Sequence, residues 1–363
     1  MKIIQILPEV NAGGVERGTL ELAAFLVAAG HEALVISNGG RLVAELERCG
    51  ARHIALPVHR KSLASLWQVR RLRRILIEER ADILHLRSRV PGWLAWRGMD
   101  EPTRPRLVST VHGFYSVNAY SAVMTRGERV IAVSESVRGY VLENYPKVPA
   151  DIIRVIARGI EPEDFGVAYR PSDAWLAAWQ AARPGLAGKR VLLLPGRITR
   201  LKGHEDFFDL IAALKAGGVP AHGLVAGETH PKKRAYLAEL HRLVRRLGIG
   251  EEVEFLGHRD DLRDVMAVSE VICGLSSQPE SFGRTVLEAL ALGKPVLGYD
   301  CGGVGELLAK LFPMGRVPPG DRVALLETAR AVLAQHPRPL PAGEPFTLGA
   351  MCRSTLGVYE ELR

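Results

Sequence analysis

The chain has 363 residues, of which 47% are hydrophobic and 24% are charged, and its formal net charge is +8. This length exceeds what one hydrophobic core usually supports, so two domains are expected. No stretch has the roughly 18 to 20 uninterrupted apolar residues of a membrane span. The four cysteines show no paired spacing, so neither a disulfide framework nor a structural zinc site is indicated. We therefore expect a cytoplasmic protein with reduced thiols.

Strands and helices alternate through the first half of the chain. The apolar patterns predict helices over 15–29 and 62–80, a helix ending near 145, and strands over 3–7, 32–36, 82–86, 106–111, 129–133 and 151–156. Alternation with short connections predicts an α/β fold with a parallel, doubly wound sheet. Ligands of such sheets bind at the carboxyl ends of the strands.

The second half repeats this plan. Strands are predicted over 190–194, 222–226, 253–256 and 271–275, with helices ending near 216 and 292 and a last helix over 348–362. The polar stretch 161–189 predicts the domain boundary, between a domain over 1–165 and one over 170–345. The proline-rich segment 336–345 predicts an extended link.

The positive charge is concentrated in one region. Residues 51–100 contain eleven Lys or Arg and four Asp or Glu, and the segment 62–80 places its apolar residues at helical spacing with Arg70, Arg71, Arg73 and Arg74 among them. One interpretation is a solvated helix packed on a sheet. The other is a basic face near an anionic membrane or a phosphorylated glycolipid. Nucleic acid is not expected as a partner, because no recognised binding motif accompanies the charge.

Two loops at predicted strand ends could approach an anion. Gly13-Gly14 follows the first strand and allows either a tight turn or close approach to a phosphate or sugar. In the second half, Arg197 and Lys202 lie on a loop that precedes a predicted helix. Both side chains could therefore reach one anionic group in front of the helix N-terminus. That loop lacks the Gly-Lys-Ser/Thr ending of a Walker A motif, the P-loop of ATP- and GTP-binding proteins. His112 ends another predicted strand, where it is either structural or directed toward a ligand.

The densest pattern runs from Ser276 to Glu306. A short apolar strand is followed by a polar loop and then by a helix that begins near Gly283 and ends at Gly293. The free N–H groups at such a helix start attract an anion. Glu280 lies on the loop and Glu288 one turn inside the helix, where a carboxylate suits a pair of ribose hydroxyls better than a phosphate.

This segment resembles the nucleotide-sugar motif of the retaining glycosyltransferases of family 4, also called group 1, which have the GT-B fold. The resemblance rests on two glutamates with seven residues between them and on the motifs around them, Glu280, Phe282-Gly283, Glu288-Ala289, Gly293-Lys294-Pro295-Val296, Gly302-Gly303 and Glu306. It implies two Rossmann-like domains that face a cleft, with the first binding the acceptor and the second the nucleotide sugar. It also implies that the terminal helix, 347–363, joins the first domain.

The resemblance assigns roles to individual residues. It implies that His112, Glu280, Arg197 and Lys202 are catalytic. The residues expected to hold the donor are Gly13, Gly14, Arg197, Lys202, Arg259, Glu280, Phe282, Gly283, Arg284 and Glu288. Candidate acceptor contacts are Tyr115, Asn118, Tyr120, His85, Arg87 and Arg89. Arg158 departs from the family, which usually has Asn at this position.

The expected reaction is transfer of a hexose from a nucleotide diphosphate sugar, with a UDP-sugar favoured, to a glycolipid or saccharide acceptor such as lipopolysaccharide core. No Asp-x-Asp pair is present, so no metal or other cofactor is expected. A location at the inner face of the cytoplasmic membrane would suit such an acceptor. Two alternatives stay open: a GT-B nucleotide-sugar 2-epimerase, and a non-catalytic protein that binds sugar or lipid.

Overall fold

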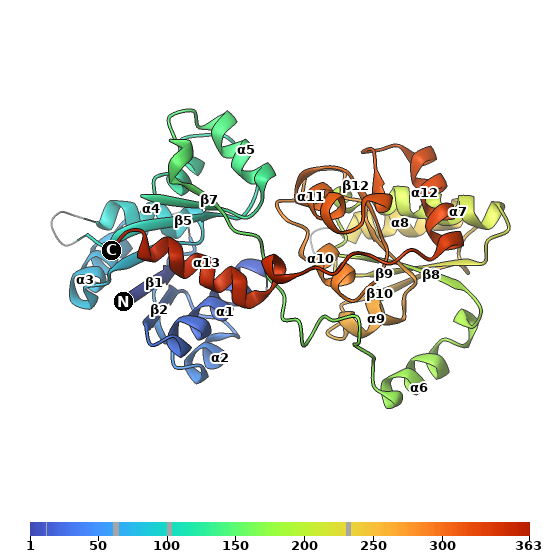
Figure 1. The fold of residues 1–363 in the computed structure, drawn as a ribbon, viewed down its shortest axis with the longest axis horizontal. Coiled ribbons are helices and arrows are strands. Elements are labelled where there is room, and N and C mark those ends of the chain that lie inside the picture. The colour runs from blue at the N-terminus through green and yellow to red at the C-terminus, as the bar shows by residue number, and fades with distance from the viewer. Residues whose placement is uncertain (12, 61–64, 100–103, 230–233) are drawn as a thin grey trace. The chain divides into compact units, whose positions relative to one another are not determined.

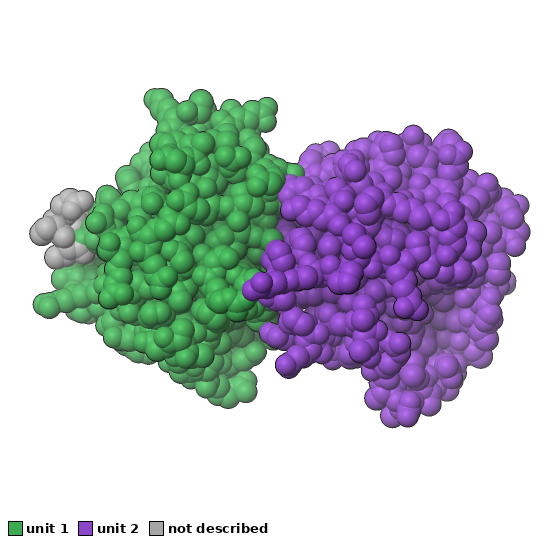
Figure 2. Space-filling model, viewed as in Figure 1, with its two compact units in different colours: residues 1–159, 348–363 green, residues 160–347 purple. Residues whose placement is uncertain are grey.

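The structure is a computed structural model that describes residues 1–11, 13–60, 65–99, 104–229 and 234–363. It divides into two compact units, residues 1–159 with 348–363 and residues 160–347. Figure 2 colours the two units separately. The sequence places the domain boundary within 161–189, and the units divide just before that stretch. None of the helices in the described part of the chain combines the length and apolar character that crossing a bilayer requires.

The N-terminal unit is built on a seven-stranded sheet in the order β3-β2-β1-β4-β5-β6-β7, and every pairing is parallel. The strands are β1 Lys2–Ile6, β2 Glu32–Ser37, β3 Arg52–Ala55, β4 Ile83–Leu86, β5 Arg106–Val111, β6 Arg129–Ala132 and β7 Ile153–Val155. The helices are α1 Gly14–Ala28, α2 Val43–Arg48, α3 Ser65–Glu79, α4 Arg89–Gly98, α5 Glu135–Asn144 and α13 Leu348–Glu360. Residues 62–64 of the predicted helix lie outside the described residues, as does Ala12.

The last helix completes the core of this unit. In Figure 1 α13 runs beside α1. Met351, Cys352 and Tyr359 on α13 are buried in the same hydrophobic cluster as Leu22 and Leu26 on α1. The N-terminal unit therefore needs a segment that is almost 200 residues away in the chain to cover one face of its sheet.

The C-terminal unit has a six-stranded parallel sheet in the order β10-β9-β8-β11-β12-β13. Its strands are β8 Arg190–Pro195, β9 Ala221–Ala226, β10 Val253–Gly257, β11 Val271–Gly274, β12 Val296–Tyr299 and β13 Arg316–Val317. Its helices are α6 Asp173–Ala182, α7 His204–Ala216, α8 Arg234–Arg246, α9 Leu262–Val268, α10 Arg284–Ala291, α11 Gly302–Leu311 and α12 Arg322–Gln335. The two parallel α/β sheets confirm the predicted fold class.

In each sheet the strand order reverses at one point, between β1 and β4 in the first and between β8 and β11 in the second. The loops that leave two such strands diverge to opposite faces of the sheet, which opens a crevice at their carboxyl ends. These two points are where ligand sites are expected.

Candidate functional site

The loop after β8 carries two basic side chains. Arg197 is exposed and forms no ion pair with a described residue. Lys202 ends a short 3₁₀ turn, and Gly203 follows with φ of +70°. A Cβ atom on Gly203 would lie 2.0 Å from the carbonyl oxygen of Leu275, so both the backbone conformation and the close approach require glycine. The loop is thereby held against the end of β11.

The loops after β8 and β11 are joined by specific contacts. The backbone N–H of Ser277 donates to the carbonyl oxygen of Leu201 at 2.9 Å. Lys202 Nζ donates to Glu280 Oε1 at 2.7 Å, and the hydroxyl of Ser276 donates to the same oxygen. The Lys202 and Glu280 side chains are 27% and 26% exposed, so a ligand can reach both. The pair therefore spans the point at which the strand order reverses.

Two glycines set the position of the Glu280 backbone. The N–H of Gly303 donates to the carbonyl oxygen of Glu280 at 2.7 Å. If Gly302 carried a Cβ atom, it would lie 2.5 Å from the Glu280 carbonyl oxygen. A Cβ atom on Gly303 would lie 2.4 Å from the Cα atom of Phe282. Phe282 itself is 6% exposed, so its side chain anchors the loop and only its backbone is placed to meet a ligand. The Gly-Gly pair thus serves the close packing of the loop against α11.

Helix α10 begins directly after this loop. Gly283 precedes it with φ of +93°, and the N–H groups of the first turn are the ones that a helix leaves without intrahelical partners. Arg284 Nε donates to Glu288 Oε1 at 3.0 Å, and the Glu288 side chain is 14% exposed. The helix start can attract an anion, and the Glu288 carboxylate can accept hydrogen bonds from hydroxyl groups.

Arg259 belongs to a different cluster. Its Nε donates to Asp261 Oδ1 at 2.7 Å, and Asp261 also accepts the indole N–H of Trp175 at 2.7 Å. Burial alone would raise the pKa of Asp261, but these hydrogen bonds hold it below its ordinary value. Arg259 follows β10, which β9 separates from β8. In this arrangement Arg259 is thus paired with Asp261 and not with Glu280.

In the N-terminal unit, Arg158 joins two predicted site residues. Its Nη2 lies 3.0 Å from His112 Nδ1 and 3.4 Å from the carbonyl oxygen of Gly14, and Gly13 is the N-cap residue of α1. Because arginine only donates, Nδ1 must accept, which assigns the remaining proton of a neutral imidazole to Nε2. His112 Nε2 is buried and has no partner among the described residues.

The charge state of His112 follows from its surroundings. Burial, and next the charges of Arg158 and Arg87, hold the pKa of His112 well below its ordinary value. The ring is therefore neutral at physiological pH and can donate through Nε2. In the sequence, Arg158 stood out only as a departure from the family, because its partner His112 is 46 residues away in the chain. Ser276 was named only as the start of the motif and its hydroxyl was given no role, although Glu280 is four residues away.

The residues expected on the acceptor side separate into two groups. Arg89 packs over the rings of Tyr115 at 4.6 Å and Tyr120 at 5.5 Å, and Asn118 caps the N–H of Ser121 at 2.9 Å. These contacts join the start of α4 to the segment after β5. His85 is fully buried and is therefore structural, because both of its ring nitrogens are already hydrogen-bonded at 2.6 Å, to Tyr359 and to Thr110.

Two family models match the chain. The one described as Glycosyltransferase Family 4 covers residues 12–164, and the one described as Glycosyl transferases group 1 covers residues 180–339. A solved glycosyltransferase from Rickettsia africae has a TM-score of 0.85 and 27% identity to this chain, and the match covers 99% of this chain and 98% of that one. The chain belongs to the group 1 glycosyltransferases of the GT-B fold. HepE from Anabaena, solved with UDP and glucose, shares the fold with a TM-score of 0.77 at 19% identity, over 100% of this chain and 98% of HepE.

Curated relatives of this glycosyltransferase are named for different reactions. The D-inositol 3-phosphate glycosyltransferase of Jonesia denitrificans is 27% identical over 78% of this chain and 72% of its own length. The lipopolysaccharide core biosynthesis mannosyltransferase LpsB of Rhizobium meliloti is 26% identical over 57% of this chain and 60% of its own length. Several other curated relatives are matched over about half their length.

Proposed function

We propose that this glycosyltransferase moves a hexose from a UDP-sugar to a glycolipid or saccharide acceptor of an envelope polysaccharide, such as lipopolysaccharide core, with retention of anomeric configuration. The observation that carries the proposal is the 2.7 Å contact between Lys202 and Glu280, which joins two predicted site motifs at the β8/β11 reversal point. UDP and glucose in the complex of HepE, and the lipopolysaccharide role of LpsB, support the choice of donor and acceptor class.

The proposed chemistry is electrostatic. The donor diphosphate would lie against Arg197, Lys202 and the first turn of α10, whose positive charge stabilises the leaving phosphate as the glycosidic bond breaks. Glu288 would accept the ribose hydroxyls. Glu280 would hold sugar hydroxyls and offset positive charge at the anomeric carbon. Lys202 is shared between Glu280 and the phosphate in this scheme, which couples the two halves of the site.

Retention would follow from attack on the face that the phosphate leaves. The leaving phosphate would take the proton of the acceptor hydroxyl, so no protein base is needed. The arginine and lysine supply the positive charge that a metal ion would otherwise provide, and we propose that transfer needs no metal or other cofactor. Activity that survives EDTA treatment would support this part of the scheme, and activity restored only by a divalent cation would contradict it.

A peripheral contact with the inner face of the cytoplasmic membrane is proposed for α3. Trp67 is 69% exposed and Ile77 is 46% exposed, and Arg71, Arg73 and Arg74 on the same helix are exposed as well. Basic residues near an anionic bilayer contribute about 1 kcal/mol each. Cosedimentation should occur with vesicles that contain phosphatidylglycerol and not with phosphatidylcholine alone. Equal binding to both vesicle types would contradict the proposal.

The donor assignment is tested by thermal shift with UDP, GDP, ADP and CMP on the parent protein and on Glu288→Ala. A ligand at about 100 times its dissociation constant adds about 2.7 kcal/mol, which raises the melting temperature by several degrees. UDP is expected to stabilise the parent and a Glu327→Ala control, since Glu327 is an exposed residue of α12. Equal stabilisation of Glu288→Ala, or none of the parent, would contradict the assignment.

The two alternative functions give different products. A 2-epimerase would release a rearranged sugar from the UDP-sugar when no acceptor is present. A non-catalytic binding protein would bind the nucleotide and release no product with any acceptor. Product analysis with and without a saccharide acceptor therefore separates all three functions.

A further inference from the structure

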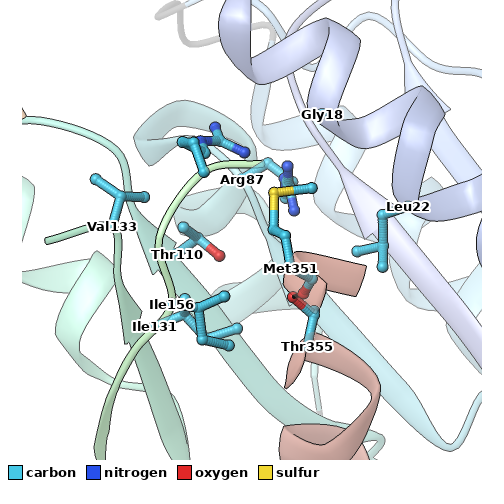
Figure 3. A pocket seen from close by; sticks show the side chains of 10 residues that line it. Gly18, Leu22, Arg87, Thr110, Ile131, Val133, Ile156, Met351 and Thr355 are labelled. Carbon is cyan, nitrogen blue, oxygen red and sulfur yellow. Dashed lines mark hydrogen bonds between the residues drawn. The ribbon is translucent and has the colours of Figure 1, made fainter. Parts of the chain in front are cut away.

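A pocket lies at the reversal point of the N-terminal sheet. Arg87 follows β4, and Gly18 lies on α1, which follows β1, so the pocket opens where these two neighbouring strands send their loops to opposite faces. Figure 3 shows its walls, which come from the sheet, α1 and α13. Most of the lining is apolar, as at Leu22, Ile131 and Met351.

Arg87 is the unusual member of this lining. It is 4% exposed, and its Nε and Nη2 atoms are buried without a hydrogen-bond partner among the described residues. Burial lowers the pKa of Arg87, and the nearby Tyr359, Cys352, Glu21 and Glu16 offset this effect only in part through longer-range electrostatics. A buried guanidinium whose N–H groups lack hydrogen-bond partners is strongly unfavourable, so a complementary anion in the pocket would relieve it.

A second guanidinium converges on the same place. A Cβ atom on Gly18 would lie 2.6 Å from Arg158 Nη1 and 3.4 Å from Arg87 Nη2, so the two positive groups approach one point beside α1. The hydroxyls that line the pocket are already engaged, Thr110 with His85 and Thr355 with the carbonyl oxygen of Met351. Two converging guanidinium groups are suited to oxyanions, which they can bind through paired hydrogen bonds.

We propose that this pocket binds an oxyanion, a phosphate or carboxylate group, and that the group is a substituent of the acceptor saccharide. The pocket belongs to the unit that also carries Arg89, Tyr115 and Tyr120. Its volume of about 20 Å³ leaves space for one small group and not for a nucleoside. Binding of the oxyanion itself is independent of the proposed function, whereas its assignment to the acceptor rests on that function.

The binding step is tested with inorganic phosphate in a chloride buffer, by calorimetry and thermal shift, with and without saturating UDP. The parent and the control Arg48→Met, which changes an exposed residue of α2, should be stabilised by phosphate. Arg87→Met and Arg158→Met should lose at least tenfold in phosphate affinity. Without phosphate, Arg87→Met should melt no lower than the parent, because it removes the unpaired buried charge.

Two results would overturn the proposal that this pocket binds an oxyanion. One is a phosphate affinity in Arg87→Met and Arg158→Met equal to that of the parent. The other is loss of the phosphate effect when UDP is saturating, which would place the anion in the donor site. If UDP itself does not bind, the proposed donor function fails. The comparison of phosphate binding between the parent and the two variants still decides whether the pocket binds an oxyanion.

The source of the oxyanion is decided by glucose 6-phosphate and glucose as probes. Tighter binding of glucose 6-phosphate than of phosphate, lost in Arg87→Met, would support a group carried by a saccharide. Equal dissociation constants for phosphate and glucose 6-phosphate would overturn the acceptor assignment and identify a site for the free anion.

Discussion

At the scale of single residues, the donor-site proposal depends on charges that are shared. Lys202 contacts Glu280 at 2.7 Å and Arg284 contacts Glu288 at 3.0 Å, while Arg197 has no ionic partner among the described residues. An incoming diphosphate would compete with the two carboxylates for these cations. The identity of the two glutamates was readable from the sequence, but their pairing was not, because Lys202 and Glu280 are 78 residues apart.

Lys202→Met gives the first prediction. It removes one positive group from the place where charge develops on the leaving phosphate, so kcat should fall about 10²- to 10³-fold. Arg200→Met is the matched control, because Arg200 lies in the same 3₁₀ turn and its side chain is 64% exposed and paired with Glu239. Steady-state transfer assays measure both variants. A Lys202→Met enzyme with near-parental kcat would remove Lys202 from the mechanism.

At the scale of elements, the β8–α7 loop is positioned by a glycine with two separate requirements. Gly203 has φ of +70° and its absent Cβ would meet a backbone oxygen at 2.0 Å. Gly218, just past the other end of α7, has φ of +77° and nothing within 4 Å of the Cβ position. Both glycines have the left-handed backbone conformation, but only at Gly203 would a Cβ atom collide with other atoms. Comparing the two positions therefore distinguishes the cost of backbone strain from the cost of a steric clash.

Gly203→Ala should therefore destabilise the protein by more than Gly218→Ala. The left-handed conformation costs either alanine roughly 1 to 2 kcal/mol, and only Gly203→Ala also forces Leu275 and the end of β11 to move. Urea unfolding followed by circular dichroism measures the difference. Equal unfolding free energies for the two variants would show that the loop can withdraw from β11 without cost.

Element prediction succeeded where the pattern was local. The strand at 106–111 and the helix over 15–29 were predicted within one residue of β5 and α1, because each carries its own apolar periodicity and a glycine or polar boundary. Strand β13 has two residues and β3 has partly exposed ones, and neither was predicted. Their strand conformation depends on the neighbouring strand that supplies their hydrogen bonds.

At the scale of the whole molecule, buried histidines predict loss of stability in mild acid. Burial lowers the pKa of His204 to about 4, and it holds the pKa of His85 and His112 well below the ordinary value. In the unfolded chain these residues titrate near pH 6.5. As the pH falls below about 6.5, the unfolded chain takes up protons that the folded chain does not, so the free energy of unfolding decreases.

Each such histidine should contribute about 1.4 kcal/mol per pH unit between about pH 6.5 and its folded pKa. Urea unfolding at pH 7, 6 and 5 measures the slope. The pH range from 7 to 5 lies above the titration of Glu79 and Glu361, whose pKa values are lowered by hydrogen-bonded ion pairs. The stability that these two carboxylates contribute is lost only at more acidic pH. His204→Leu should reduce the slope by the contribution of one histidine, about 1.4 kcal/mol per pH unit. An unchanged slope would contradict the lowered pKa of His204.

The sequence by itself determined the α/β plan, the parallel doubly wound sheets and the family, because strand and helix periodicity and the Glu280–Glu288 motif are local features. Only the tertiary structure decided which of the predicted residues meet. It paired Lys202 with Glu280, placed Arg259 with Asp261, and buried His85 under Tyr359. It also brought Arg87 and Arg158 to one point beside Gly18. Apart from Arg259 and Asp261, which are two residues apart, these contacts join segments that are distant in the chain. The tertiary fold brings those segments together, and residue spacing carries no record of it.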